Sequence, residues 1–208
     1  MRIKGILMVV LCFGVYQMEA QKQSDWQEGS YVDRNNQVHT GFISYAYSQN
    51  PKFKFKSGES ARERKVKATD IKGFVIQQDS FVVMNNIKID ARESAASGNI
   101  PVDFVQVVET GYLTLYRHYT SVYHGGDSYS TTHGSSIGAG SSNIIETYII
   151  KKPESGALLT IYSEPKTYQK QLLEVFQNDP ELLFKISQGE VKYSELPELV
   201  KSYNAGLK

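Results

Sequence analysis

The hydrophobic pattern of the chain changes its period once. From residue 30 to residue 162, apolar and polar positions alternate in short runs separated by turn residues, which predicts β-strands with one buried face. The clearest run, Lys52 to Lys56, places Phe53 and Phe55 on one face and three lysines on the other. After Pro165 the spacing lengthens to the roughly 3.6 residues of an amphipathic helix. Strands followed by helices predict an α+β fold.

The strand region predicts a mainly antiparallel β-meander, twisted into a half-barrel sheet. Residues 34–37 are expected to turn between the first two strands, because asparagine tolerates the positive φ angles of tight hairpins. Residues 91–100 and 124–142 are small and polar and are predicted to be loops, the second a flexible Gly/Ser/His loop. The predicted strands are 30–33, 38–47, 52–56, 62–67, 74–77, 80–89, 104–108, 112–123, 144–151 and 157–162.

The C-terminal part, residues 164–204, predicts two or three short helices. Asp179 and Pro180 have the residue types that begin a helix, and Gly189 is typical of a helix end. Ser194 can cap a further helix. We expect these helices to pack on one face or at one end of the sheet.

The N-terminus predicts export. Arg2 and Lys4 precede the uncharged run 6–16, and a polar exit ends in Ala20. This run is shorter than the about 20 residues that span a bilayer, and its order is that of a secretory signal peptide, although a buried element of the fold is the alternative. We expect residues 1–20 to be a signal peptide and residues 21–208 to be a single soluble β-rich domain without a transmembrane segment. Removal of the signal peptide also removes Cys12, the only cysteine, which excludes disulfides and thiolate sites from the mature chain.

Charge is balanced over the mature chain but not along it. Removing residues 1–20 takes two basic and one acidic side chain from totals of 23 and 22, which leaves 21 of each. This balance favours neither nucleic acid nor an anionic membrane as a partner. Residues 52–67 nevertheless carry a net charge of +5 and could bind phosphate or an acidic glycan. The alternative is that these side chains lie on the solvent-exposed face of a sheet and protect its edge from pairing with another strand. The candidate binding cations are Lys52, Lys54, Lys56 and Arg64.

Tyrosine is the second candidate for binding. The chain has 14 tyrosines, and several gather in one stretch, where exposed rings could stack on sugars or form a protein interface. The alternative is ordinary β-propensity and core packing. The candidate residues are Tyr112, Tyr116, Tyr119 and Tyr123, with Tyr129 nearby.

Catalytic signals are sparse. His118, His124 and His133 are close in sequence, with Asp127 between the last two, and these residue types bind zinc or copper; the preferred interpretation is that they are solvated loop histidines. Residues 134–138 match the G-x-S-x-G pattern of a nucleophile elbow, but a strand is expected after the serine and no histidine follows His133, so the match is attributed to chance. No cofactor motif is present, and no cofactor is expected.

Six short segments characterise the chain: Ala20–Gln21, Thr40–Ile43, Ala68–Phe74, Glu109–Tyr116, Asn178–Leu182 and Ser202–Asn204. With these segments the chain resembles exported proteins of Bacteroidota whose function is unknown. The resemblance covers most of the mature chain. It implies a location in the envelope of a bacterium with an outer membrane, and it implies no activity and no catalytic residues.

The sequence therefore favours an exported cell-envelope protein, periplasmic, outer-membrane-associated or extracellular, that binds another protein or a glycan without catalysis. The alternative is a metal-dependent hydrolase that uses His118, His124 and Asp127. A structural envelope component without a small ligand is a third hypothesis.

Overall fold

The computed structural model describes residues 26–46, 51–89, 98–124, 129–131, 134–136 and 141–207. Within these ranges, the side chains of residues 121–124, 129–131, 134–136 and 141–143 are not described. The predicted signal peptide lies outside the described residues and stays a prediction. None of the helices in the described ranges has the length and apolar character needed to cross a bilayer.

Ten strands form one antiparallel, open sheet, and helices follow it in the chain, which confirms the α+β prediction. The order across the sheet is β12-β11-β8-β7-β6-β5-β1-β2-β3-β4. Strands β9 and β10 form a separate two-stranded hairpin. The ten strands are β1 (Gln27–Asp33), β2 (Val38–Ser44), β3 (Lys52–Lys56), β4 (Arg64–Lys67), β5 (Ile71–Ile76), β6 (Asp79–Lys88), β7 (Asn99–Glu109), β8 (Thr114–His124), β11 (Ser141–Lys151) and β12 (Leu158–Ile161).

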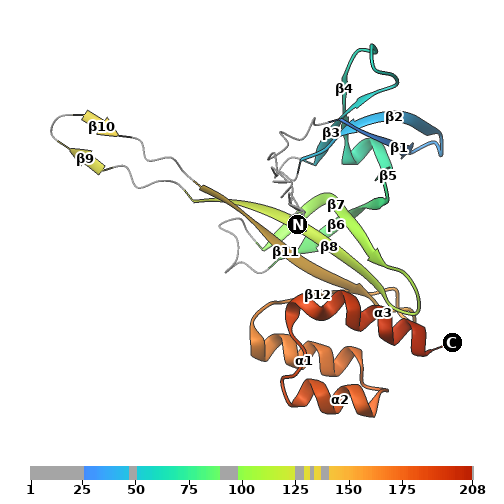
Figure 1. Ribbon diagram of the computed structural model, residues 1–208, viewed down its shortest axis with the longest axis vertical. Helices are drawn as coiled ribbons and strands as arrows, with labels where there is room; N and C mark the ends of the chain where they lie inside the picture. Colours follow the sequence, from blue (N-terminus) through green and yellow to red (C-terminus); the bar gives the residue numbers. More distant parts are fainter. Residues whose placement is uncertain are drawn as a thin grey trace, which may run out of the picture.

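The N-terminal half of the sheet departs from the simple meander that the sequence predicts. After β4 the chain returns through a three-residue 3₁₀ helix, η1 (Ala68–Asp70), and β5 pairs with β1 rather than with β4. A connection this short can join two strands that are four places apart in the order only if the strands between them curl, so β5-β1-β2-β3-β4 bends around its inner face. Figure 1 shows this curled part above the rest of the sheet.

Aromatic side chains fill the inner face of that curl. Phe74 lies at the centre, with its ring stacked on Phe81 at 4.6 Å and perpendicular to Phe104 at 4.9 Å between centroids. Such stacked and edge-to-face pairs add to the stabilisation from burial alone. The buried members of this aromatic core are Tyr31, Ile43, Phe53, Phe55, Val66, Ala68, Ile71, Phe74, Ile76, Phe81 and Phe104.

Local chemistry explains the first hairpin. Asn36 has φ of 67°, as the sequence suggests for this turn, and the Asp33 carboxylate accepts hydrogen bonds from the backbone N–H groups of Asn35 (2.8 Å) and Gln37 (2.9 Å). Gly41 follows in β2, where a Cβ atom would lie 2.1 Å from the carbonyl oxygen of Lys56. Only glycine therefore allows β3 to approach β2 so closely at this point.

The second half of the sheet is a true meander from β5 to β12, apart from the β9–β10 hairpin. Its inner apolar cluster consists of Met84, Ile87, Ile89, Val105 and Ile149. The Thr160 hydroxyl of β12 donates to the carbonyl of Lys88 at the end of β6, at 2.9 Å, although three strands separate β6 from β12 in the order. This half of the sheet therefore curls as well.

A long hairpin extends from the sheet. β8 and β11 pair at eleven positions, from Thr114 opposite Lys151 to His124 opposite Ser141. Beyond them, β9 (Tyr129–Thr131) and β10 (Gly134–Ser136) pair with each other, and Figure 1 shows them apart from the rest of the molecule. The expected loop 124–142 is thus wrong where the structure describes it, because those residues form paired strands. The serine of the G-x-S-x-G match, Ser136, ends β10.

The helices form at the predicted places and share one core with the end of the sheet (Figure 1). In α2 the Asp179 side chain accepts from Leu182 N, and Pro180 occupies the first turn, as predicted. Asn204 of α3 locks the last helix to the β7–β8 turn, because its side chain accepts from Leu113 N (2.8 Å) and donates to Leu113 O (2.9 Å). The helical elements are α1 (Pro165–Val175), α2 (Pro180–Ser187), η2 (Tyr193–Glu195) and α3 (Leu196–Gly206).

The two edges of the sheet are protected differently. At β12, the Gln171 side chain of α1 donates to Thr160 O at 2.7 Å and accepts from Tyr162 N at 3.0 Å. This side chain satisfies backbone groups that would otherwise offer a template to another strand. At the other edge, β4 exposes Lys65 and Lys67 instead.

Candidate functional site

Five lysines share the outer face of β3 and β4. Along β3 the burial alternates, with Phe53 and Phe55 buried and the lysines on the opposite face, as the sequence predicts. The register places two lysines of β4 directly opposite two of β3, namely Lys67 opposite Lys52 and Lys65 opposite Lys54. We call this set the lysine face; its members are Lys52, Lys54, Lys56, Lys65 and Lys67.

The lysine face is electrostatically unfavourable in the isolated protein. Like charges directly opposite each other on paired strands are destabilising. Among the described residues, the carboxylate paired with this face is Glu63, whose Oε1 lies 3.4 Å from Lys54 Nζ. Lysines that guard a sheet edge would explain Lys65 and Lys67 on β4, but β3 is an inner strand and has no free edge. A bound anion would neutralise both rows.

Aromatic side chains border the lysine face. Lys56 Nζ lies 4.1 Å from the centroid of the Trp26 ring, which is a cation–π contact. Phe42 of β2 is the cross-strand neighbour of Lys56, and Ser44 is that of Lys54. The face therefore offers cations, an indole and a hydroxyl together, and the single tryptophan of the chain provides a fluorescence probe of this surface.

Arg64, the fourth candidate cation from the sequence, lies on the other face. The register pairs it with Phe55, so both side chains point to the inner face of the curl. Its guanidinium donates to the Tyr31 hydroxyl and lies 5.1 Å from the centroid of Phe55. Arg64 thus closes the open end of the aromatic core and does not belong to the lysine face.

The structure disperses the candidate tyrosines. Tyr112 precedes β8 and donates to Glu154 at 3.1 Å, a hydrogen bond that raises its pKa. Tyr116 packs against the cluster of Met84 and its neighbours, and burial raises its pKa. Tyr119 points to the opposite face of β8 and donates to Gln106 at 3.2 Å. The side chain of Tyr123 is not described, and the three described tyrosines form no common aromatic surface.

His118 is buried inside the sheet. It is 1% exposed, its Nε2 lies 2.9 Å from Asp103 Oδ2, and its Nδ1 lies 3.3 Å from the Thr120 hydroxyl. The Asp103 carboxylate also accepts from Phe104 N. The side chain of His124 is not described and Asp127 lies outside the described residues. Within the described part of the chain, no three His, Cys, Asp or Glu residues gather where they could hold a metal ion. The contacts of His118 therefore give a structural pair with Asp103.

Arg117 lies on the same face of β8 as Tyr119, in a cleft of about 710 Å³ between the β8–β11 hairpin and the start of α3. Its guanidinium lies between two rings, 5.8 Å from the centroid of Tyr119 and 5.6 Å from that of Tyr148. Burial lowers its pKa, but Tyr119, Tyr148 and Glu146 outweigh that effect, so the pKa lies above its ordinary value.

The hydrogen bonding of Arg117 is incomplete. Nη1 donates to the Tyr119 hydroxyl at 3.0 Å and lies 3.7 Å from Glu146 Oε1. Nε is buried and has no hydrogen-bond partner among the described residues. A buried unpaired donor costs about 1–3 kcal/mol, which makes this arginine an unusual feature of the fold. Sequence reasoning missed it, because the cleft joins residues far apart in the chain.

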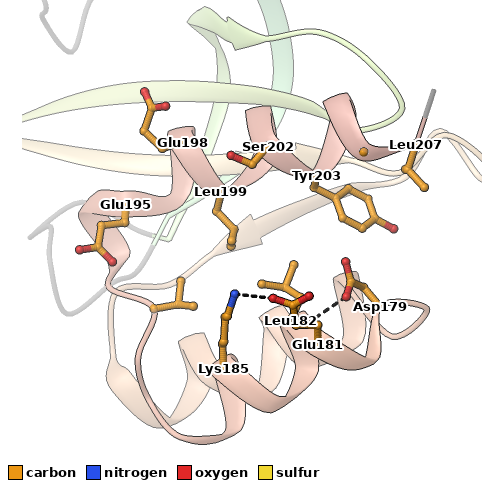
Figure 2. Close-up of a pocket in the computed structure, with 12 residues that line it drawn as sticks. Asp179, Glu181, Leu182, Lys185, Glu195, Glu198, Leu199, Ser202, Tyr203 and Leu207 are labelled. Atoms are coloured by element: carbon orange, nitrogen blue, oxygen red, sulfur yellow. Dashed lines mark hydrogen bonds and ion pairs between the residues drawn. The ribbon is translucent and has the colours of Figure 1, made fainter.

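A groove also separates α2 from α3 (Figure 2). Leu182, Leu199 and Tyr203 provide its apolar surface, and it encloses about 590 Å³. Its acidic residues are Asp179, Glu181, Glu195 and Glu198, and its one lysine, Lys185, pairs with Glu181 at 2.7 Å.

Comparison with known protein families, with curated proteins and with solved structures found no match in any of the three. The function is therefore argued from the residues of this chain alone.

Proposed function

We propose that this protein is a non-catalytic binding module of the bacterial cell envelope, and that the lysine face binds an acidic glycan. The observation that carries the proposal is the pair of like-charged cross-strand contacts, Lys52–Lys67 and Lys54–Lys65. A linear anion laid along the strands would turn two repulsive rows into attractive contacts.

The chemistry of the surface favours a glycan over a compact anion. Lysines two apart on a strand are spaced by about 7 Å, and paired strands by about 5 Å, so the charges form an extended lattice rather than a closed pocket. Trp26 and Phe42 at its border offer apolar surface of the kind on which sugar rings stack. A predicted signal peptide would bring this face into contact with envelope polysaccharides.

The test measures Trp26 fluorescence during titration with a uronic-acid oligosaccharide, a neutral maltooligosaccharide and inorganic polyphosphate. We expect saturable binding of the uronic-acid probe, weakening as salt rises, and no response to the neutral sugar. The double variant Lys52→Gln/Lys67→Gln should weaken binding about tenfold or more, because each lost contact with an anion is worth about 1 kcal/mol.

The matched control is Lys166→Gln/Lys170→Gln on α1, which removes the same charge from exposed positions outside the lysine face. Equal losses in the two double variants would show that only net charge matters and would refute a site on the lysine face. Equal affinity for polyphosphate would refute the assignment to a glycan.

A further inference from the structure

The cleft at Arg117 is a second candidate binding site, separate from the lysine face. It is lined by side chains from β8, β11, the β12–α1 connection, η2 and α3. Its volume of about 710 Å³ falls in the range of small-molecule sites, and such sites commonly form where two structural units meet. Here the long hairpin meets the helical unit (Figure 1).

The guanidinium has more donors than its surroundings satisfy. Arginine carries five N–H donors in a planar fork. Around Arg117 the described acceptors are the Tyr119 hydroxyl at 3.0 Å and a Glu146 oxygen at 3.7 Å, which is longer than a hydrogen bond. The Nε donor has no described partner, but it is buried, so a ligand in the cleft would bind the terminal Nη groups of the side chain, which is 24% exposed. Flanking rings hold the fork in place, so little conformational freedom is lost when it binds a carboxylate.

The other charges of the cleft select against a simple anion. Glu146 and Glu198 line the same cleft, so its net charge with Arg117 is negative. The Glu146 side chain is 44% exposed and also forms a hydrogen bond with Tyr148, and Glu198 is exposed, so a ligand in the cleft can reach both carboxylates. A ligand that carries an ammonium group as well as a carboxylate would satisfy both signs. Ser163 and Ser194 also line the cleft, and a serine hydroxyl can both donate and accept a hydrogen bond.

We propose that this cleft binds a small zwitterion of dipeptide size, with its carboxylate on Arg117 and its ammonium on Glu146 and Glu198. The carboxylate takes the donors that the protein leaves over, and it frees Glu146 from its long contact with Arg117. This site is independent of the lysine face and does not depend on glycan binding.

The experiment titrates the protein with three related probes: dialanine, dialanine amide and N-acetyl-dialanine. Chemical-shift changes of the protein by NMR report binding. We expect dialanine to bind in the millimolar range, and each blocked probe to bind about tenfold or more weakly, because it lacks one of the two charges. Equal binding of dialanine and its amide would overturn the role of Arg117, and no shift with dialanine would overturn the site.

Two variants locate the site. Arg117→Lys keeps the charge but loses the planar fork, and we expect about a tenfold weaker binding of dialanine. Glu198→Gln replaces one oxygen of an exposed carboxylate by an NH2 group and therefore does not disturb the core. This variant should weaken dialanine binding at least threefold without changing the affinity for N-acetyl-dialanine. The lysine-face variant Lys52→Gln/Lys67→Gln is the control and should bind dialanine normally. Unchanged dialanine binding in Glu198→Gln would overturn the proposed ammonium site.

Discussion

Reversing one charge of the lysine face should stabilise the protein and weaken its binding together. The substitution Lys65→Glu turns the Lys54–Lys65 pair from like to opposite charge at a position directly across the strands. Two unit charges about 6 Å apart in water interact by about 0.7 kcal/mol, so the reversal amounts to about 1.4 kcal/mol without salt. Screening at physiological ionic strength reduces this by about half, to roughly 0.7 kcal/mol.

The assay is thermal unfolding at low and high salt. For a chain of this size, a gain of about 0.7 kcal/mol corresponds to an increase of about 2 °C in Tm. The neutral variant Lys65→Gln should show about half of that increase, because it removes the repulsion without adding an attraction. In about 1 M salt the Debye length falls to about 3 Å, and both increases should vanish. Binding of the uronic-acid probe should weaken about tenfold at low salt.

The reasoning fails if Lys65→Glu lowers or does not change Tm at low salt, or if its effect persists at high salt. A lowered Tm in Lys65→Glu is the result expected if Lys65 stabilises the fold instead of binding a ligand. An increase in Tm together with reduced binding would show that the protein keeps an unfavourable charge arrangement for the sake of its ligand.

Three other features give separate tests. Asn204→Ala removes both hydrogen bonds to Leu113 and leaves the backbone N–H and C=O groups of Leu113 unsatisfied. We expect the free energy of unfolding, measured in urea, to fall by about 2 kcal/mol. His118→Leu leaves the buried Asp103 carboxylate without its imidazole partner and should cost about 3 kcal/mol, while adding Asp103→Leu should restore part of the loss. Burial raises the pKa of Tyr168, so its contribution to stability is complete below about pH 10 and falls as pH rises further. In an alkaline titration followed by circular dichroism, Tyr168→Phe should therefore unfold at a higher pH than the parent protein.

Each of these tests has an outcome that contradicts it. A stable Asn204→Ala variant would show that α3 is held by its apolar face alone. Equal losses for the single and double variants at His118 would show that packing, and not the buried polar pair, accounts for the effect. For Tyr168, alkaline unfolding at the same pH as in the phenylalanine variant would assign the transition to another group.

Local signals predicted the elements of the fold well. The alternation in β3, the asparagine turn after β1 and the Asp179–Pro180 start of α2 all depend on neighbouring residues, and the structure confirms them. The position of β5 beside β1 depends on pairing between distant segments, which alternation does not specify. The hairpin within residues 124–142 has few apolar side chains, so the composition concealed its strands.

The candidate site was predicted only as far as its strands. Alternation correctly separated the lysines of β3 from its phenylalanines, but only the register shows that Lys65 and Lys67 join them and that Arg64 does not. The tyrosines illustrate the same limit, because Tyr116 and Tyr119 are three positions apart on one strand, and an odd offset sends them to opposite faces. Arg117 gains its importance from Glu146 and from α3, which no local pattern could reveal.

If the lysine face binds an anion, the unequal protection of the two sheet edges makes self-association depend on that ligand. At β12 the protecting group is the Gln171 side chain of α1, whose hydrogen bonds do not change with ionic conditions. At β4 the protection is charge alone, and two copies that approach through this strand repel each other through Lys65 and Lys67. An anion that neutralises the lysine face removes that repulsion. A long acidic polymer would thus act as a scaffold, and molecules bound along it could join in pairs through their β4 edges, an association that the free protein resists.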